Sequence, residues 1–297
     1  MTVSVYVPAV LSVLVAVLGR FIAVRLAPTR WTTFTVVGAA VLCASGTAWA
    51  LLLLSFTLLG FTTFAVQEAS ERGVRLVQPV PGVVGVLAVI MLAVGVVRAV
   101  KVLRIRLATR KELRELCRSC GPGELVVVPV DEPHAFAVPG RPGRVLVTQG
   151  LLALLDSKER RVVLAHERAH LHGHHHGLRA ALEVCAAVNP LLVPVREAVA
   201  FIVERAADER AAAVSGSREA TAAALAKAAL AETGQLCAGL GFITCAVSAR
   251  VAALQAAPPR PKPLWLGGML MLGVGTAAAA VQATLAFCRL IEWLWPA

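Results

Sequence analysis

The sequence predicts an α-helical membrane protein with about four transmembrane helices and a small α+β domain ahead of the last of them. Apolar residues make up 58% of the 297 residues, whereas a soluble globular protein has roughly 45–50%. The excess lies in long blocks with almost no charge. Each block has at least the ~20 residues that cross a hydrocarbon core of roughly 30 Å as a helix. Charged residues are only 16% of the chain and cluster in its middle.

Apolar blocks follow one another along the chain at about residues 3–24, 34–61, 79–100 and 264–295. The first block has no basic segment before it and no clear small-residue cleavage site, so we interpret it as a retained span rather than a signal peptide. We therefore predict three transmembrane helices within residues 1–100, a domain at 101–260, and a linker with the fourth helix at 261–297. The linker is stiff and basic because of its proline-rich run.

Basic residues predict the orientation of the spans. The segment from Arg98 to Arg118 holds a run of lysines and arginines that only Glu112 and Glu115 offset. Because such segments stay on the cytoplasmic side of a membrane, we expect the 101–260 domain in the cytoplasm and both termini outside, in a multi-pass cell-membrane protein. The formal net charge of +11 then suits contact with the lipid bilayer rather than direct contact with nucleic acid, for which no aromatic-plus-basic pattern is present.

The cysteines argue against a secreted disulfide framework. Their number, seven, is odd, and Cys43 and Cys288 lie in apolar blocks. Cys117 and Cys120 form a lone CxxC, which could be redox-active or half of a zinc knuckle, but no second CxxC is present. We expect no function for this pair.

The middle domain is expected to start with a helix and three short strands. Residues 101–120 extend the third span as a basic helix, which Gly121-Pro122-Gly123 ends. Runs of β-branched and apolar residues bounded by turn residues predict strands at residues 124–130, 135–138 and 144–148.

Helices follow these strands. One begins at Gly150 and ends near residue 155. Asp156, with Glu159 three residues later, predicts a capped start for the next helix, which runs to about Gly173.

The apolar stretch at residues 178–203 is harder to interpret. It contains charged residues, and Asn189-Pro190 and Pro194 interrupt it. We interpret it as two helices that dip partly into the membrane or cover the site, with a fifth crossing as the alternative. Residues 204–231 are rich in alanine and predict helix, with a second helix after Ser215-Gly216.

His166-Glu167-Arg168-Ala169-His170 is an HExxH sequence. Residues four apart share one face of a helix, so the two imidazoles can reach one metal ion. Glu167 can then poise a water molecule and act as the general base. The alternative is an exposed helix that carries two histidines and a glutamate by chance. The small and apolar residues around the motif favour a buried helix.

Glu204 and Asp208 supply carboxylates on a later helix, one turn apart. A catalytic zinc ion commonly has three protein ligands, and two histidines with one glutamate are a standard set. We therefore predict Zn²⁺ bound by His166, His170 and Glu204, with Asp208 as the hydrogen-bond acceptor that orients a ligating imidazole. The alternative is a solvated helix face, since charged residues follow Asp208 directly.

These residues together resemble the membrane gluzincin peptidases, a group that includes HtpX-like, CAAX-prenyl-protease-like and BlaR/MecR antirepressor enzymes. The resemblance covers about residues 100–215 in motif and the whole chain in topology. Within it, the short Asn-Pro link between the two zinc helices favours the BlaR/MecR side. The matching stretches are Ala135–Ala137, Val145–Leu152, Glu159, Leu164–His170, Asn189-Pro190, Glu204 and Asp208.

The resemblance implies a small zincin-like peptidase domain that cleaves a protein substrate at the cytoplasmic face. The strand holding Ala135, Phe136 and Ala137 would pair with the substrate backbone as a sheet edge; an ordinary core strand is the alternative. On the BlaR/MecR side the substrate would be a small DNA-binding repressor, in a signalling pathway. On the HtpX side the enzyme would be a membrane quality-control protease.

Two further hypotheses remain open at this stage. The histidine run at residues 172–176 could be a metal-collecting loop of a transporter, but we expect a hydrated helix end there instead. A transporter also needs polar ligands inside its spans, and the first three blocks carry almost none. An inactive peptidase-like scaffold is the second. The substrate's identity, the activating signal, the oligomeric state and the group that stabilises the oxyanion are not predicted.

Overall fold

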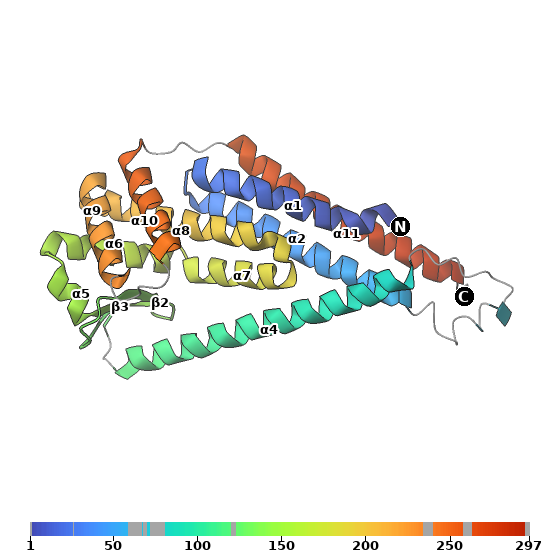
Figure 1. Cartoon of the computed structure of the whole chain (residues 1–297), viewed down its shortest axis with the longest axis horizontal. Helices are drawn as coiled ribbons and strands as arrows, with labels where there is room; N and C mark the ends of the chain where they lie inside the picture. Colours follow the sequence, from blue (N-terminus) through green and yellow to red (C-terminus); the bar gives the residue numbers. More distant parts are fainter. Residues whose placement is uncertain are drawn as a thin grey trace.

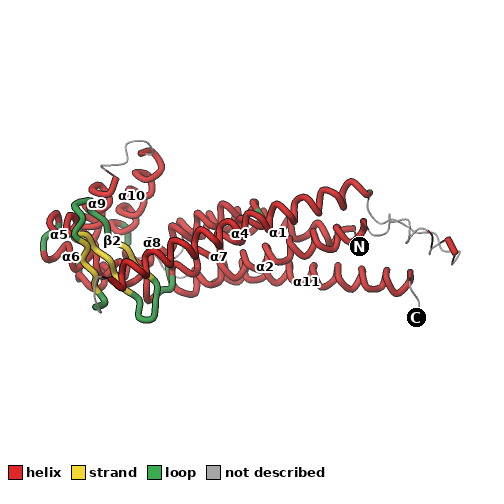
Figure 2. The backbone as a smooth tube through the Cα atoms, turned by 90° about the horizontal axis from the view of Figure 1, so that it is seen from below, coloured by secondary structure: helices red, strands yellow, loops and turns green. Residues whose placement is uncertain are grey.

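The computed structural model describes residues 2–25, 27–58, 67, 70–71, 81–119, 123–233, 240–257 and 263–294. The molecule is elongated, with a bundle of long helices at one end and a compact domain of short helices around a small sheet at the other (Figure 1). Both termini lie at the end of the bundle far from the sheet (Figures 1 and 2). This division agrees with the predicted fold class.

Three helices of the described chain are long and apolar enough to cross a membrane. They are α2 (Arg30–Phe56), α4 (Gly82–Ser119) and α11 (Pro263–Leu294). The helix α1 (Thr2–Arg25) runs beside α2 and α11 in the bundle (Figure 1), but its described side chains qualify only as a shorter apolar helix, Val7–Gly19. Three of the four predicted spans are therefore confirmed as candidate spans, and the first stays a prediction.

The helix α4 runs unbroken through residue 100, where the sequence suggested a domain limit. Its basic half therefore reaches from the bundle to the sheet as one rigid rod (Figure 1). The limits of the predicted domains stay a prediction. The Gly-Pro stop after α4 lies at residues 120–122, outside the described residues, as does Cys120 of the CxxC sequence. Cys117 is 3% exposed and packs against Val126 in a small core.

The stretch after the histidine run forms α7 (His175–Val188), a short 3₁₀ turn η2 (Pro190–Leu192), and α8 (Val193–Ser215). Side chains of α7 and of the first half of α8 share one hydrophobic core with α1, α2 and α11. The two predicted helices with an Asn-Pro break are thus observed. The predicted interruption at Pro194 is wrong, because Pro194 stands in the first turn of α8, where the missing N–H removes no helical hydrogen bond.

Asn189 anchors this helical hairpin inside the bundle. Its Nδ2 donates to Ser12 Oγ of α1 at 2.8 Å and to Thr47 Oγ1 of α2 at 3.0 Å. Its Oδ1 accepts from the backbone N–H of Leu191 at 3.1 Å, so the buried amide is satisfied on both sides. From this anchor, α8 leads out of the bundle and into the compact domain (Figure 1).

The small sheet contains β1 (Leu125–Val128), β2 (Ala135–Val138) and β3 (Arg144–Thr148), in the spatial order β1-β3-β2. The central strand β3 pairs parallel with β1 and antiparallel with β2. All three strands lie where the sequence predicts them, the first of them shorter. Within the described residues β2 is paired on one side only, so it is an edge strand, and a short helix, α5 (Gln149–Leu154), follows β3.

The helix α6 (Ser157–His172) starts at the predicted capping box. Asp156 Oδ1 accepts from the backbone N–H of Glu159 at 2.8 Å, and Glu159 Oε2 accepts from the backbone N–H of Asp156 at 2.8 Å. The Glu159 carboxylate also pairs with Lys227 at 2.7 Å, which ties α9 (Arg218–Thr233) to α6. The predicted break before α9 is observed at Gly216, whose φ of 75° is left-handed and favours glycine.

One further helix, α10 (Leu240–Gln255), has no counterpart in the sequence prediction. Arg218 at the start of α9 holds its C-terminal end by donating to the carbonyl oxygens of Ala253 and Leu254, each at 2.9 Å. A cation at the carbonyl end of a helix also favours the helix dipole. This contact places the inner face of α10 against α8, next to the acidic residues described below.

Candidate metal centre

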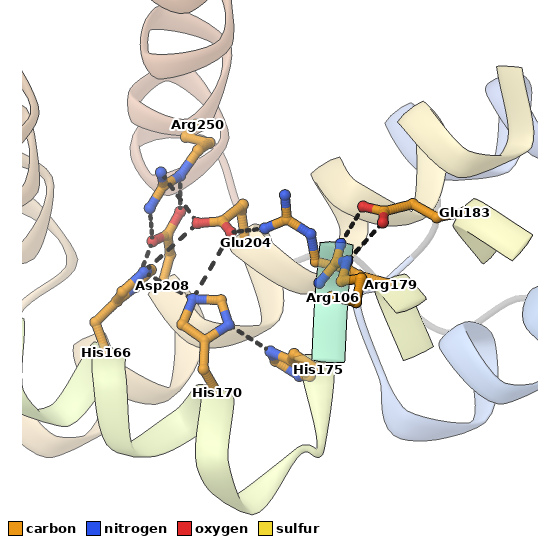
Figure 3. A network of polar contacts seen from close by, with 9 residues as sticks. All are labelled: Arg106, His166, His170, His175, Arg179, Glu183, Glu204, Asp208 and Arg250. Atoms are coloured by element: carbon orange, nitrogen blue, oxygen red, sulfur yellow. Dashed lines mark hydrogen bonds and ion pairs between the residues drawn. The ribbon is translucent and has the colours of Figure 1, made fainter. Parts of the chain in front are cut away.

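Two helices bring the predicted ligands together. On α6, His166 and His170 are one turn apart and share a face, and on α8 the same spacing places Glu204 and Asp208 on one face. The two faces pack against each other, and all four side chains point into the space between the helices (Figure 3). The prediction that Glu204 approaches both imidazoles is therefore confirmed.

His166, His170 and Glu204 form a group able to hold a metal ion. The two imidazole Nε2 atoms are 3.1 Å apart. His166 Nε2 lies 3.5 Å from Glu204 Oε2, and His170 Nε2 lies 3.7 Å from Glu204 Oε1. Ligand atoms at about 2.1 Å from a tetrahedral zinc ion are about 3.4 Å from one another. The spacing and the chemistry of the donor atoms therefore both fit zinc.

Asp208 lies behind His166, on the side away from the ligand atoms. Its Oδ1 is 3.0 Å from His166 Nδ1, and its side chain is only 2% exposed. A carboxylate in this place is able to fix an imidazole so that Nε2 faces the space between the helices, and the orienting role of Asp208 stays a prediction.

Arg250 of α10 contacts both carboxylates and is absent from the sequence prediction. Its Nε and Nη2 donate to the two oxygens of Asp208 at 2.8 Å and 2.6 Å, and its Nη1 lies 3.3 Å from Glu204 Oε2 (Figure 3). The planar guanidinium suits this two-point contact. Pairing with Arg250 offsets the cost of burying the Asp208 carboxylate, but no local sequence pattern around Arg250 indicates this contact.

His175 is the second residue that sequence reasoning missed. Its Nδ1 lies 2.8 Å from Nδ1 of His170, so it contacts the second ligand histidine from behind as Asp208 contacts the first. His175 is 7% exposed, and the expectation of a hydrated histidine run is therefore wrong for this residue. The chain reverses at His174, which has a φ of 51°, and this turn directs His175 back toward the site. His172 is exposed, as expected.

The two ligand histidines differ in their charge state in the metal-free site. Burial lowers the pKa of His170 to about 3, which leaves this ring neutral and ready to bind metal. Burial acts in the same direction on His166, but the carboxylates of Asp208 and Glu204 outweigh it and raise the pKa of His166 to about 9. Burial favours the neutral acid of Glu204, yet the hydrogen bond from His166 and the charges of His170, Arg250 and His166 together outweigh burial and lower the pKa of this carboxyl. Metal binding therefore has to displace a proton from His166.

A cleft of about 460 Å³ opens over the ligands. Glu167 lines it together with the ligand residues, and so do Ala135, Phe136 and Ala137 of β2. The sequence-predicted residues thus gather around one cavity, except Asp208, which lies behind the ligands. Arg106 and Arg179 also line the cleft, and Arg179 Nη1 is 3.5 Å from Glu204 Oε1.

Replacing Arg250 by glutamine is expected to lower zinc affinity about 10–100-fold, the usual effect of losing a group behind the ligands. The change leaves the buried Asp208 carboxylate without its cation. Zinc affinity is measured by competition with a chelator of known affinity. The matched control is Arg210→Gln on the exposed side of α8, and Arg250→Lys keeps the charge but loses the two-point contact. Unchanged affinity in the Arg250→Gln protein would contradict this role.

Comparison with known proteins bears on the same region. Residues 109–262, which include every residue of the metal centre, match peptidase family M48. A stretch of 50 residues is 46% identical to a protease HtpX homolog of Aquifex aeolicus (strain VF5). That stretch is 16% of this chain and 17% of the relative, so the chain matches about a sixth of the relative's length. No solved structure matches the chain. Because the family match covers more than half of the chain, and because His166, His170 and Glu204 form a group able to hold zinc, the chain belongs to peptidase family M48.

Proposed function

We propose that this chain is an HtpX-like endopeptidase that cleaves partly unfolded or membrane-associated protein segments at the cytoplasmic face of the cell membrane. One observation carries the proposal. The zinc ligands, an adjacent glutamate and a one-sided strand edge line a single cleft at the end of a bundle of candidate spans. A protein segment that leaves the membrane there would meet the cleft in extended form.

Glu167 is the proposed general base. When bound, zinc supplies Lewis acidity that lowers the pKa of water to roughly 7 and polarises a peptide carbonyl. The Glu167 carboxylate would take a proton from the attacking water and deliver it to the leaving amine. Its place beside His166 on α6, within the cleft, suits both steps.

The cleft also has a cationic side. Arg179 and Arg250 lie 3.5 Å and 3.3 Å from the two oxygens of Glu204 and line the same cavity. We propose that their positive charge stabilises the oxygen of the scissile carbonyl as it becomes negative. Arg250 is held by two hydrogen bonds to Asp208, so its charge is already in place before the substrate arrives.

The edge strand β2 is the proposed substrate platform. The backbone N–H of Thr148 donates to the carbonyl of His134 at 3.0 Å, so the residues at these two positions face each other across the ladder. Backbone hydrogen-bonding groups point to alternate sides along a strand. The backbone N–H and C=O of Phe136 therefore point toward β3, whereas those of Ala135 and Ala137 point to the open side, at the cleft. A substrate strand would pair with these groups, and its side chains would choose among pockets on either side.

Replacing Ala137 by proline is expected to lower kcat/KM at least about tenfold, because proline removes the outward N–H without removing a donor to β3. The loss should appear mainly as a higher KM, while zinc content stays at the wild-type level. The control is Ala137→Ser, which keeps the N–H. If the proline variant cleaves as well as the serine variant, β2 is an ordinary core strand.

Comparative proteomics tests the substrate class. Cells with the wild-type chain and cells with the Glu167→Gln chain are compared, and proteins that accumulate only in the second are substrates. We expect misassembled membrane proteins among them. Accumulation of a single DNA-binding repressor would instead support the BlaR/MecR hypothesis. The comparisons favour the HtpX side, and the Asn189-Pro190 link that suggested BlaR/MecR is occupied in packing the hairpin into the bundle.

The orientation and the first span are tested separately. The proposed topology has the compact domain in the cytoplasm, both termini outside, and α1 as a fourth span. With 24 residues, α1 is about 36 Å long and can cross a bilayer. Membrane-impermeant thiol labelling of single cysteines placed at either terminus should label intact cells. If a terminus is labelled only after lysis, either the orientation is the reverse of the proposed one or α1 does not cross the membrane.

A further inference from the structure

A second cavity adjoins the active-site cleft and is strongly basic. It has a volume of about 580 Å³ and lies between the last turns of α4 and the loop that joins β2 to β3. Among the described residues no carboxylate lines it. We call this cavity the basic hollow, and its guanidinium groups belong to Arg110, Arg114, Arg118, Arg141 and Arg144.

Two of these arginines hold the walls together, whereas Arg110 and Arg141 have no ion pair within the described residues. Arg114 Nε donates to the carbonyl of Pro139 at 3.1 Å, and Arg144 donates to the carbonyl of Cys117. In contrast, the Nε atom of Arg110 is buried without a hydrogen-bond partner in the described structure. Arg141 is exposed on the loop, and the described part of the chain gives it no ion pair. The hollow therefore has positive charge that no described group of this chain neutralises.

The basic hollow continues directly from the cleft. His176 lines both cavities. The edge strand β2 begins with Ala135 in the cleft and ends with Val138 at the hollow. A peptide bound antiparallel to β2 would run from the hollow toward the metal ligands, so the residues in the hollow would precede the scissile bond.

We propose that the basic hollow binds acidic side chains of the protein substrate, about two to four residues before the scissile bond at ~3.3 Å per strand residue. This inference rests on the proposed endopeptidase function and adds a substrate preference to it. Arginine binds carboxylates through paired hydrogen bonds, and a partly enclosed site screens the charges less than open water does. The pocket that selects the acid would thus be separate from the groups that cleave the bond.

The position of the hollow argues for a peptide rather than a lipid headgroup. The apolar part of α4 ends near Val100, so Arg110 and Arg118 lie about 15 Å and 27 Å further along the helix. The field of an anionic membrane decays over about 8 Å at physiological ionic strength. The arginines of α4 are also explained by the preference of basic residues for the cytoplasmic end of a span. That preference does not explain why Arg141 and Arg144, which follow strand β2, line the same cavity.

The test uses the full-length, zinc-loaded protein in nanodiscs of zwitterionic lipid and a mixed library of ten-residue peptides. Cleavage sites are read by mass spectrometry, with the Glu167→Gln protein as background. Peptide pairs with Glu or Gln at the selected position then give kcat/KM. We expect about a tenfold preference for Glu, the size of one charge-assisted hydrogen-bonded pair, and a preference near twofold or less in Arg110→Gln/Arg141→Gln. The control is Arg104→Gln/Arg161→Gln, which removes equal charge outside the hollow and should keep the full preference.

The outcomes separate this inference from the proposed function. If the wild-type protein cleaves no peptide above the Glu167→Gln background, the proposed function fails. If it cleaves without an acidic preference before the bond, or if the double variant keeps a tenfold preference, only the basic hollow proposal fails. If the double variant differs from the wild-type protein only in nanodiscs with anionic lipid, the hollow binds lipid headgroups, and the basic hollow proposal also fails. Should the double variant cleave neither peptide, Arg141→Gln alone, on an exposed loop, must lower the preference at least about twofold for the proposal to stand.

Discussion

The Glu167→Gln protein should lose peptidase activity by a factor of about a thousand or more while it keeps its zinc. General acid–base catalysis by one positioned carboxylate contributes roughly 10²–10⁴-fold. Glutamine has nearly the same shape as glutamate but cannot accept a proton. Glu167 is outside the ligand group of His166, His170 and Glu204, so the metal should stay bound. Cleavage of a peptide and zinc content by elemental analysis are measured on the same preparation.

The control for this prediction is Glu132→Gln, an exposed carboxylate in the turn before β2, which should retain full activity. Comparable activity in the Glu167→Gln and wild-type proteins would remove Glu167 from the mechanism. Loss of zinc together with activity would mean that Glu167 holds the metal, directly or through the α6 helix.

The Glu204→Ala protein should lose zinc as well as activity. Zinc sites in small domains contribute roughly 10–16 kcal/mol of apparent binding free energy. Divided over three ligands, this is about 3–5 kcal/mol for each, which corresponds to a loss of affinity of a hundredfold or more. The substitution also leaves Arg179 and Arg250 beside the site without their shared carboxylate, and their charge then repels a cation. Zinc per chain after dialysis against a weak chelator is the direct measurement.

Glu197→Ala is the matched control, because Glu197 stands on the same helix α8 with a 61% exposed side chain and should leave the zinc content unchanged. A wild-type zinc content in the Glu204→Ala protein would mean that the third ligand is another residue. A normal zinc content with no activity would instead assign Glu204 to catalysis.

Much of the centre is local and therefore readable from sequence. The helical period places His166 and His170 on one face, and the same period joins Glu204 to Asp208. Asp156 and Glu159 specify the start of α6, because each satisfies the backbone donor of the other. These features depend on residues a few positions apart, so neighbouring side chains decide them.

The fold was also predictable where composition is extreme. Long uncharged blocks predict α2, α4 and α11, since only a helix satisfies its own backbone in lipid. The break at Asn189-Pro190 was readable as well, because proline ends a helix. The effect of Pro194 was not, since whether a proline breaks a helix or begins one depends on where the preceding turn ends.

By itself, then, the sequence determined three candidate spans, the helical pairing of the zinc ligands and the short strands. The tertiary structure decided which distant groups meet them: Arg250 on Asp208, His175 on His170, and the arginines of α4 and the sheet in one hollow. The reason is that a cation buried behind a carboxylate is selected by the packing of helices far apart in the chain. Neither the composition nor the helical period of the sequence specifies that packing, so these contacts follow only from the tertiary structure, in which α10 packs against α8.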